Sequence, residues 1–196
     1  MTNLTVLTPP AEAAVPVSKA KAFLRIGHDG EDDLVSDLID QATARVEQAS
    51  GLALVSRVLQ VEWLHWPPDI GGRGARLPVG PVRALQAVRV YDEQRTVSDE
   101  TARFRLVSFP LEGGRLALQP WSMVPGIEPG GAAQVVFEAG FGGAGDVPAD
   151  LVEAVLLTAA ARYGARSPGA FDFEGGEDGL PADVQAILNR RRGIRL

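Results

Sequence analysis

The glycines at residues 140–145 form the pattern most suggestive of chemistry, because GFGGAG matches G-x-G-x-x-G, the fingerprint of a dinucleotide-binding turn. In that fingerprint the next helix begins inside the motif, so its N-terminal amides face a pyrophosphate. Here Asp146 and Pro148 follow, which puts a carboxylate where phosphate would lie and removes one amide donor. We interpret the stretch as a flexible turn between a strand and a helix. A nucleotide-binding enzyme is kept only as a minor alternative.

Six acidic residues gather within residues 29–40: Asp29, Glu31, Asp32, Asp33, Asp37 and Asp40. An EF-hand loop needs glycine at its sixth position and glutamate at its twelfth, and counting from Asp29 these positions hold leucine and aspartate. Acids at the start of a helix also complement its dipole. We therefore expect a solvated helix start rather than a calcium site or a pair of catalytic carboxylates.

Other residue types that carry chemistry are scarce. The chain has no cysteine, which excludes disulfides, thiolate nucleophiles and cysteine-bound clusters, and it has two histidines, too few for a histidine-rich metal site. Neither a nucleophile elbow nor a P-loop is present. Trp63, Trp66 and Trp121 could stack on a ligand, but packing is the more common use of tryptophan. The sequence predicts no enzyme, no cofactor and no metal.

The charge balance is acidic, with 19 basic and 25 acidic residues and a formal net charge of −6. A basic surface over the whole protein, as for gripping nucleic acid, is therefore excluded. The C-terminus is the exception, since its residues include four arginines and two apolar side chains: Arg190, Arg191, Arg192, Ile194, Arg195 and Leu196. They could complement a helix C-terminus, or they could form a tail that docks on an acidic partner or touches nucleic acid. Both interpretations stay open.

Hydrophobic periodicity changes twice along the chain. Helical spacing predicts helices over residues 19–26, 34–46 (with Gly51 as the stop), 148–164 and 181–192. Between residues 52 and 140 the period is two, which indicates about five short antiparallel strands. In one of them Leu85, Ala87 and Tyr91 are expected on one face. The longest apolar stretch, residues 151–161, is about half a membrane span, so no membrane segment and no signal peptide are expected.

The predicted class is α+β: an antiparallel α-helical core with a small inserted antiparallel β segment, an extended N-terminal arm and a C-terminal helix and tail. The apolar stripes of residues 34–46 and 151–163 are too wide to leave in water, so we expect these two helices to pack together. The expected division is an arm at 1–17, a helical part at 18–52, a β insertion at 53–140, a second helical part at 141–164, and a linker with the C-terminal helix and tail at 165–196.

Five short motifs follow one another along the chain. Residues 17–25 read VSKAKAFLR, residues 29–34 read DGEDDL, and residues 77–82 read LPVGPV. VVFEAGFG at 135–142 leads to VPADL at 147–151, and Leu180-Pro181 precedes the arginine-rich end. Over nearly its whole length the sequence thus resembles the head–tail connector, or adaptor, proteins of long-tailed phages and gene transfer agents.

The resemblance implies a structural role in a virion or phage-like particle made in the bacterial cytoplasm. Such adaptors form a ring, usually a dodecamer, between the portal protein and a stopper or tail-completion protein at the DNA-exit vertex. DNA would be only passing cargo, and an acidic channel would repel it rather than bind it. The C-terminal arginines and apolar anchors would then contact the portal. The chief alternative is a nucleic-acid-binding accessory protein that uses the same arginine-rich C-terminus.

Overall fold

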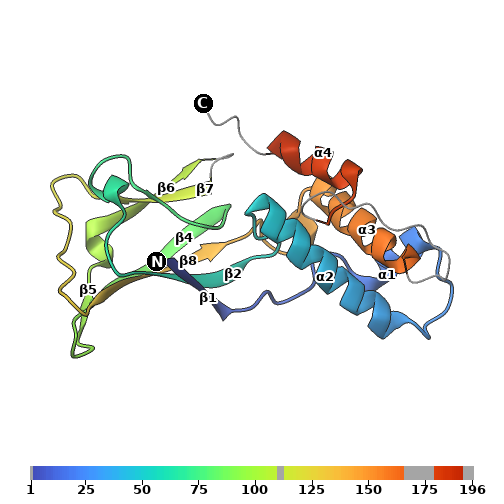
Figure 1. Ribbon diagram of the computed structural model, residues 1–196, viewed down its shortest axis with the longest axis horizontal. Helices are drawn as coiled ribbons and strands as arrows, with labels where there is room; N and C mark the ends of the chain where they lie inside the picture. Colours follow the sequence, from blue (N-terminus) through green and yellow to red (C-terminus); the bar gives the residue numbers. More distant parts are fainter. Residues whose placement is uncertain (1, 110–112, 166–178, 192–196) are drawn as a thin grey trace. The chain divides into compact units, whose positions relative to one another are not determined.

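The computed structural model describes residues 2–109, 113–165 and 179–191 (Figure 1). Within these ranges the chain forms four α-helices and eight strands, which confirms the α+β class. The chain divides into two compact units, each built from two chain segments. The β unit comprises Met1–Pro10 and Ser56–Gly140, and the helical unit comprises Ala11–Val55 and Phe141–Leu196. The first ten residues therefore group with the strands instead of standing apart as an arm.

The helical unit contains all four helices: α1 (Val17–Leu24), α2 (Asp32–Ser50), α3 (Ala149–Gly164) and α4 (Ala182–Arg191). Helix α1 begins two residues earlier than predicted, because the Pro16 carbonyl accepts hydrogen bonds from the amides of Lys19 and Ala20. Helix α2 ends where predicted, since Gly51 adopts the left-handed conformation (φ 71°) that terminates helices. The Glu47 carboxylate then accepts a hydrogen bond from the Leu54 amide at 2.8 Å and holds the following turn.

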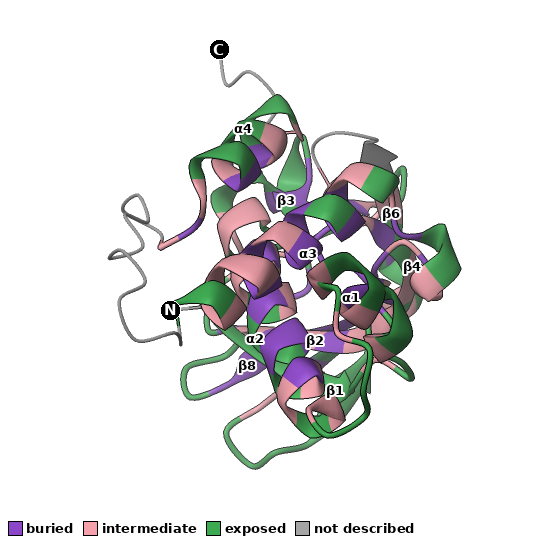
Figure 2. Ribbon diagram, turned by 90° about the vertical axis from the view of Figure 1, so that its right-hand side faces the viewer, coloured by how far each residue is buried: buried purple, intermediate pink, exposed green. Residues whose placement is uncertain are grey.

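Helices α2 and α3 pack against each other, as their apolar stripes predicted. The fully buried side chains of α2 include Val35, Ile39 and Val46, and those of α3 include Leu151 and Val155. Figure 2 shows buried segments of both helices in purple, and these five side chains belong to one continuous core. Thr158, the one buried polar side chain among the described residues, donates its hydroxyl to the Ala154 carbonyl at 2.8 Å. The core thus accommodates a hydroxyl without leaving it unpaired.

Helix α4 completes this core. Its buried side chains Val184 and Leu188, with Leu180 just before the helix, are each no more than 2% exposed. A helix this short is only marginally stable alone and needs a surface to fold against. Helix α3 of the same chain provides that surface.

The β unit is built on a five-stranded antiparallel sheet in the order β1-β2-β8-β4-β5. Its strands are β1 (Thr2–Thr8), β2 (Arg57–Trp63), β4 (Val82–Tyr91), β5 (Val97–Asp99) and β8 (Ala132–Ala139). Strand β2 alternates as predicted, with Leu59, Val61 and Trp63 buried. The expected N-terminal arm is extended over residues 2–8, but there it pairs with β2 as an edge strand. This part of the arm is therefore ordered within the chain itself.

Strand β4 departs from the predicted alternation. Its pairing with β8 shifts register between Val82 and Ala84 and again between Leu85 and Ala87. Each irregularity changes the face toward which the following side chains point. As a result, Ala87 and Val88 are both buried, whereas Leu85 and Tyr91 are only partly buried. A strict two-residue period could not anticipate this.

A second, three-stranded sheet has the order β3-β7-β6. Its strands are β3 (Ala75–Arg76), β6 (Phe104–Phe109) and β7 (Gly113–Leu118). A Cβ atom added at Gly114 of β7 would lie 2.6 Å from the Val82 side chain of β4, so the close approach of the two sheets requires glycine there. Within the described ranges, no helix combines the length and the apolar character needed to cross a bilayer.

Candidate partner-binding site

The arginine-rich C-terminus is only partly within the described residues. Arg190 is exposed at the end of α4, and Arg191 is partly buried beside it. The remaining predicted site residues, Arg192, Ile194, Arg195 and Leu196, lie outside the described residues. The two arginines that the structure does place have different surroundings and therefore different uses.

Arg191 forms a two-pronged ion pair with Asp150 in the first turn of α3. Its Nε donates to Oδ2 at 2.6 Å, and its terminal nitrogen donates to Oδ1 at 2.5 Å. This hydrogen-bonded guanidinium holds the pKa of the Asp150 carboxyl below its usual value, although burial acts in the opposite direction. Arg191 therefore fastens α4 to α3. Of the two C-terminal arginines that the structure describes, Arg190 is the one that remains available to a partner.

The glycine turn at residues 140–145 has its amides already occupied. The Gly143 amide donates to the Asp146 carboxylate at 3.0 Å. The Ala144 amide donates to the Glu12 carboxylate at 2.7 Å. Both carboxylates stand where a nucleotide phosphate would have to bind, so the turn connects β8 to α3 and is not built as an anion cradle.

The acidic helix start is partly neutralised by one lysine. The Lys21 ammonium lies 2.6 Å from both the Asp29 and the Asp32 carboxylates. Hydrogen bonds to Asp29 and then Asp32 raise the pKa of Lys21, and the same contact lowers the pKa of Asp29. No group of three or more potential metal ligands occurs in the part of the chain that the structure describes.

The three tryptophans divide into two kinds. Trp63, Trp66 and Phe104 form an aromatic cluster, with ring centroids 6.0 and 5.2 Å apart along the series. Trp66 also donates its indole N–H to the Pro125 carbonyl at 2.7 Å, which anchors the loop that follows β7. In that loop Trp121 is fully exposed, and Met123 is 78% exposed. The expectation of packing is therefore correct for two tryptophans and wrong for Trp121, for whose exposure the sequence carried no signal.

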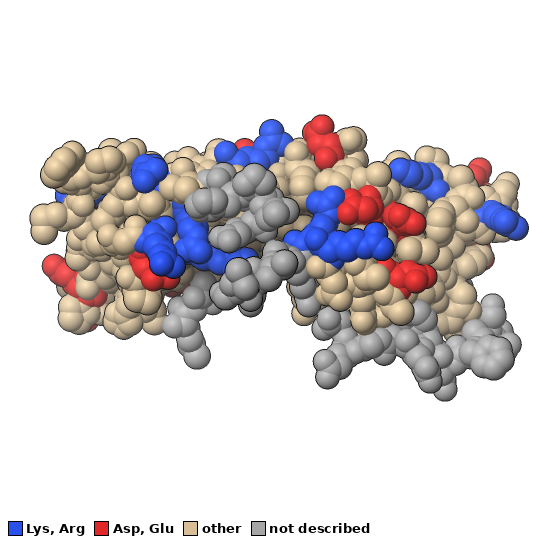
Figure 3. All heavy atoms as spheres, turned by 90° about the horizontal axis from the view of Figure 1, so that it is seen from above, with Lys and Arg blue, Asp and Glu red and all other residues tan. Residues whose placement is uncertain are grey.

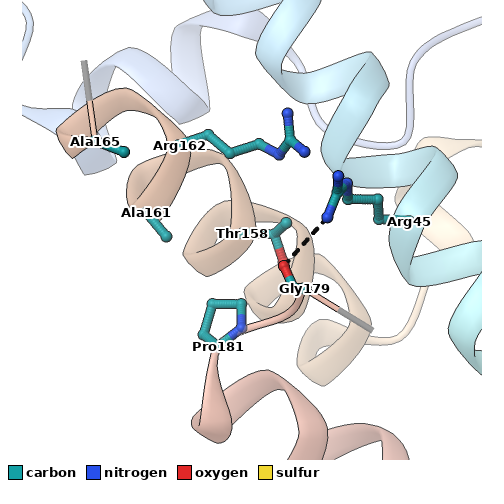
Figure 4. Close-up of a pocket in the computed structure, with 7 residues that line it drawn as sticks. All are labelled: Arg45, Thr158, Ala161, Arg162, Ala165, Gly179 and Pro181. Atoms are coloured by element: carbon teal, nitrogen blue, oxygen red, sulfur yellow. Dashed lines mark hydrogen bonds between the residues drawn. The ribbon is translucent and has the colours of Figure 1, made fainter. Parts of the chain in front are cut away.

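A cavity of about 290 Å³ lies among α2, α3 and the segment that leads into α4 (Figure 4). Arg45 of α2 and Arg162 of α3 extend toward each other beside it, and Gly179 and Pro181 close another side. Sequence reasoning missed this site, because these two arginines are far apart in the chain and meet only when the helices pack.

Charges on the face drawn in Figure 3 are mixed. Basic and acidic side chains lie beside one another there instead of forming separate fields. Among the described side chains drawn on this face, basic residues do not gather apart from acidic ones as they do in a stripe that tracks a nucleic-acid backbone.

Comparison with known proteins gives consistent findings. The model of a family described as phage gp6-like head-tail connector protein matches residues 15–109. No curated protein matches the chain. Among solved structures, a chain in the neck of an empty gene transfer agent particle, computed with C6 symmetry, is 28% identical, with a TM-score of 0.80 over 99% of this chain and 97% of that one.

Two further structures are similar to the same degree. A chain in the virion of a native gene transfer agent particle is 29% identical, with a TM-score of 0.80 over 98% of this chain and 96% of that one. A chain in the neck of a native gene transfer agent particle, computed with C12 symmetry, is 29% identical, with a TM-score of 0.79 over 99% of this chain and 97% of that one. The resemblance drawn from the sequence motifs is thereby confirmed. Residues 15–109 of this chain thus match the phage head–tail connector family, and nearly the whole chain is similar to proteins of gene transfer agent particles.

Proposed function

We propose that this connector is a ring-forming adaptor in the neck of a phage or gene transfer agent particle, between the portal and a stopper or tail-completion protein. The observation that carries this is a similarity over 99% of the chain to proteins in gene transfer agent necks computed with C6 and C12 symmetry. A twelve-membered ring fits both symmetries. We expect isolated subunits to be monomeric or weakly associated, which light scattering can measure, and a tight dodecamer without any partner would contradict this.

A structural rather than catalytic role is supported by the described residues. The turn that imitates a dinucleotide fingerprint has its amides paired with Asp146 and Glu12. Two of the acids around the start of α2, Asp29 and Asp32, are bound by Lys21. These groups stabilise turns and helix ends, which is the chemistry expected of a connector.

The C-terminus is proposed as the portal-binding segment, through Arg190, Arg192, Ile194, Arg195 and Leu196. Helix α4, fastened by Arg191 and by two buried side chains, provides a firm base from which this segment begins. Guanidinium groups pair with carboxylates through two parallel hydrogen bonds, so an acidic groove would be a suitable receptor. A tail clamped to moving DNA would hinder ejection, which favours a protein partner.

The test is assembly onto purified portal rings. Deleting residues 193–196, or making Arg190→Glu together with Arg192→Glu, should abolish portal binding without changing the melting temperature. Arg191 is left unchanged because its replacement would also leave Asp150 unpaired. Arg73→Glu is the matched control, because Arg73 is an exposed arginine of the β unit. If the truncated chain still assembles on portals, the portal contact lies elsewhere.

The arginine-rich end also supports the second candidate, a nucleic-acid-binding accessory protein. That function requires DNA affinity that falls steeply with salt, because neutralised phosphates release counterions. Removing residues 190–196 would have to abolish that affinity. The net charge of −6 opposes it, so we expect weak binding that the deletion does not change.

A further inference from the structure

Two cations share the cavity between α2 and α3 without a carboxylate partner among the described residues. Arg45 donates to the Gly179 carbonyl at 3.2 Å (Figure 4). Arg162 donates to the side-chain oxygen of Gln41 at 2.7 Å. Both acceptors are neutral. The other residues that line the cavity are also uncharged: Thr158, Ala161, Ala165, Gly179 and Pro181.

Like charges held close together disfavour each other and favour an added anion. Burial lowers the pKa of Arg162 below its usual value, and the charge of Arg45 lowers it further. An arginine nonetheless stays protonated in a protein, so the repulsion between the two side chains persists at neutral pH. Because each guanidinium keeps donors beyond the one it uses here, the cavity can offer a carboxylate several charge-assisted hydrogen bonds.

Three aspartates whose charge is opposite to that of the cavity lie on the same chain. Asp33, Asp37 and Asp40, which we call the acidic stripe, are exposed on α2 and make no ion pair among the described residues. Their spacing of four and three residues puts them on one face of the helix. That face is opposite the buried positions Ile39, Ala42 and Val46, so the stripe points away from the core.

We propose that the Arg45–Arg162 cavity of one copy accepts aspartate side chains of the acidic stripe of the neighbouring copy in the ring. This rests on the proposed function, in which copies of the chain meet head to tail around a ring. A head-to-tail ring contact requires two different surfaces of one chain that complement each other. The cavity and the stripe are such a pair, opposite in charge and both within the helical unit.

The test uses two variants with reversed charges. The cavity variant is Arg45→Glu with Arg162→Glu, and the stripe variant is Asp33→Arg with Asp37→Arg and Asp40→Arg. In each variant the two surfaces have the same sign, so we expect at least a tenfold loss of ring assembly on portals. An equal mixture should assemble, because each contact between the two variants pairs opposite charges and an even-numbered ring can alternate. A misfolded variant would not be rescued by mixing.

Two controls separate the possible outcomes. Unsubstituted protein is imaged on portals first, and the absence of rings there would refute the proposed function itself. A third variant neutralises the acids at positions 172, 174, 177 and 178 of the same chain, and we expect it to assemble normally. If rings form but the cavity variant assembles normally, or if the mixture is not rescued, the inference is wrong while the proposed function stands. If the third variant reproduces the defect without rescue by mixing, the cavity binds a carboxylate of its own chain.

Discussion

Replacing Val155 with aspartate tests the core that joins α2 and α3. Val155 is fully buried in the same cluster as Ile39 and Val46. Removing a buried valine costs roughly 1.5–3 kcal/mol of apolar burial. An unpaired polar group adds roughly 1–3 kcal/mol, so Val155→Asp should lower the free energy of unfolding by about 3–6 kcal/mol. For a chain of this size each kcal/mol corresponds to about 2–4 °C, so the melting temperature should fall by at least about 6 °C.

Two spectroscopic signals can follow the two units separately. All three tryptophans lie in the β unit, so their fluorescence reports on that unit, whereas the far-ultraviolet helix signal reports mainly on the helical unit. We expect Val155→Asp to lower the helix transition more than the tryptophan transition. Burial would raise the pKa of the new carboxyl, so the loss should be largest at neutral pH and smaller as acid protonates the group.

The matched control is Glu153→Gln, on the exposed side of the same helix. It should change the free energy of unfolding by no more than about 0.5 kcal/mol. If Val155→Asp melts within about 2 °C of the unsubstituted protein, the packing of α3 against α2 is wrong.

Further predictions concern other contacts. Asp150→Asn should loosen α4 by about 1 kcal/mol or less, because the pair with Arg191 is partly exposed, and hydrogen exchange of the α4 amides should show it. Because Arg191 lowers the pKa of Asp150, the pair should stabilise the fold fully above the ordinary aspartate pKa, and this stabilisation should disappear as the pH falls through the lowered pKa. In an acid titration, Asp150→Asn should not show this loss of stability. Gly114→Ala should destabilise the β unit by roughly 1–3 kcal/mol by forcing Val82 aside, measured as a lower tryptophan-fluorescence midpoint in urea. Trp121→Phe should leave the free energy of unfolding unchanged and remove most of the tryptophan fluorescence that iodide quenches. If iodide still quenches the variant as strongly, the exposed tryptophan is not Trp121.

The helices were predictable because their signals are local. Periodic apolar residues marked α2 and α3, and Gly51 marked the end of α2 at the correct position. The start of α1 was misplaced because its cap is Pro16, whose backbone carbonyl accepts the first hydrogen bonds and whose side chain makes no cap hydrogen bond. Local sequence signals therefore predict that a helix forms more reliably than they predict its first and last residues.

The strands were less predictable because their partners are distant in sequence. Nothing in residues 2–8 indicates that they pair with β2, and the register shifts of β4 depend on its neighbour β8. The candidate sites have the same property. Arg190 and Arg191 look alike in sequence, and only the fold shows that Arg191 is bound to Asp150. The convergence of Arg45 and Arg162 likewise requires the packed helices.

The order of strands in the main sheet has a consequence for how the chain is completed during synthesis. Strand β8 lies between β2 and β4, yet it is the last strand of its unit to be made. The helical core likewise waits for α3, which follows β8 in the chain. A nascent chain that stops before residue 132 would hold the pairs β1–β2 and β4–β5 with no strand to join them. Such open strand edges template aggregation, so both units are most vulnerable until the last third of the chain has left the ribosome.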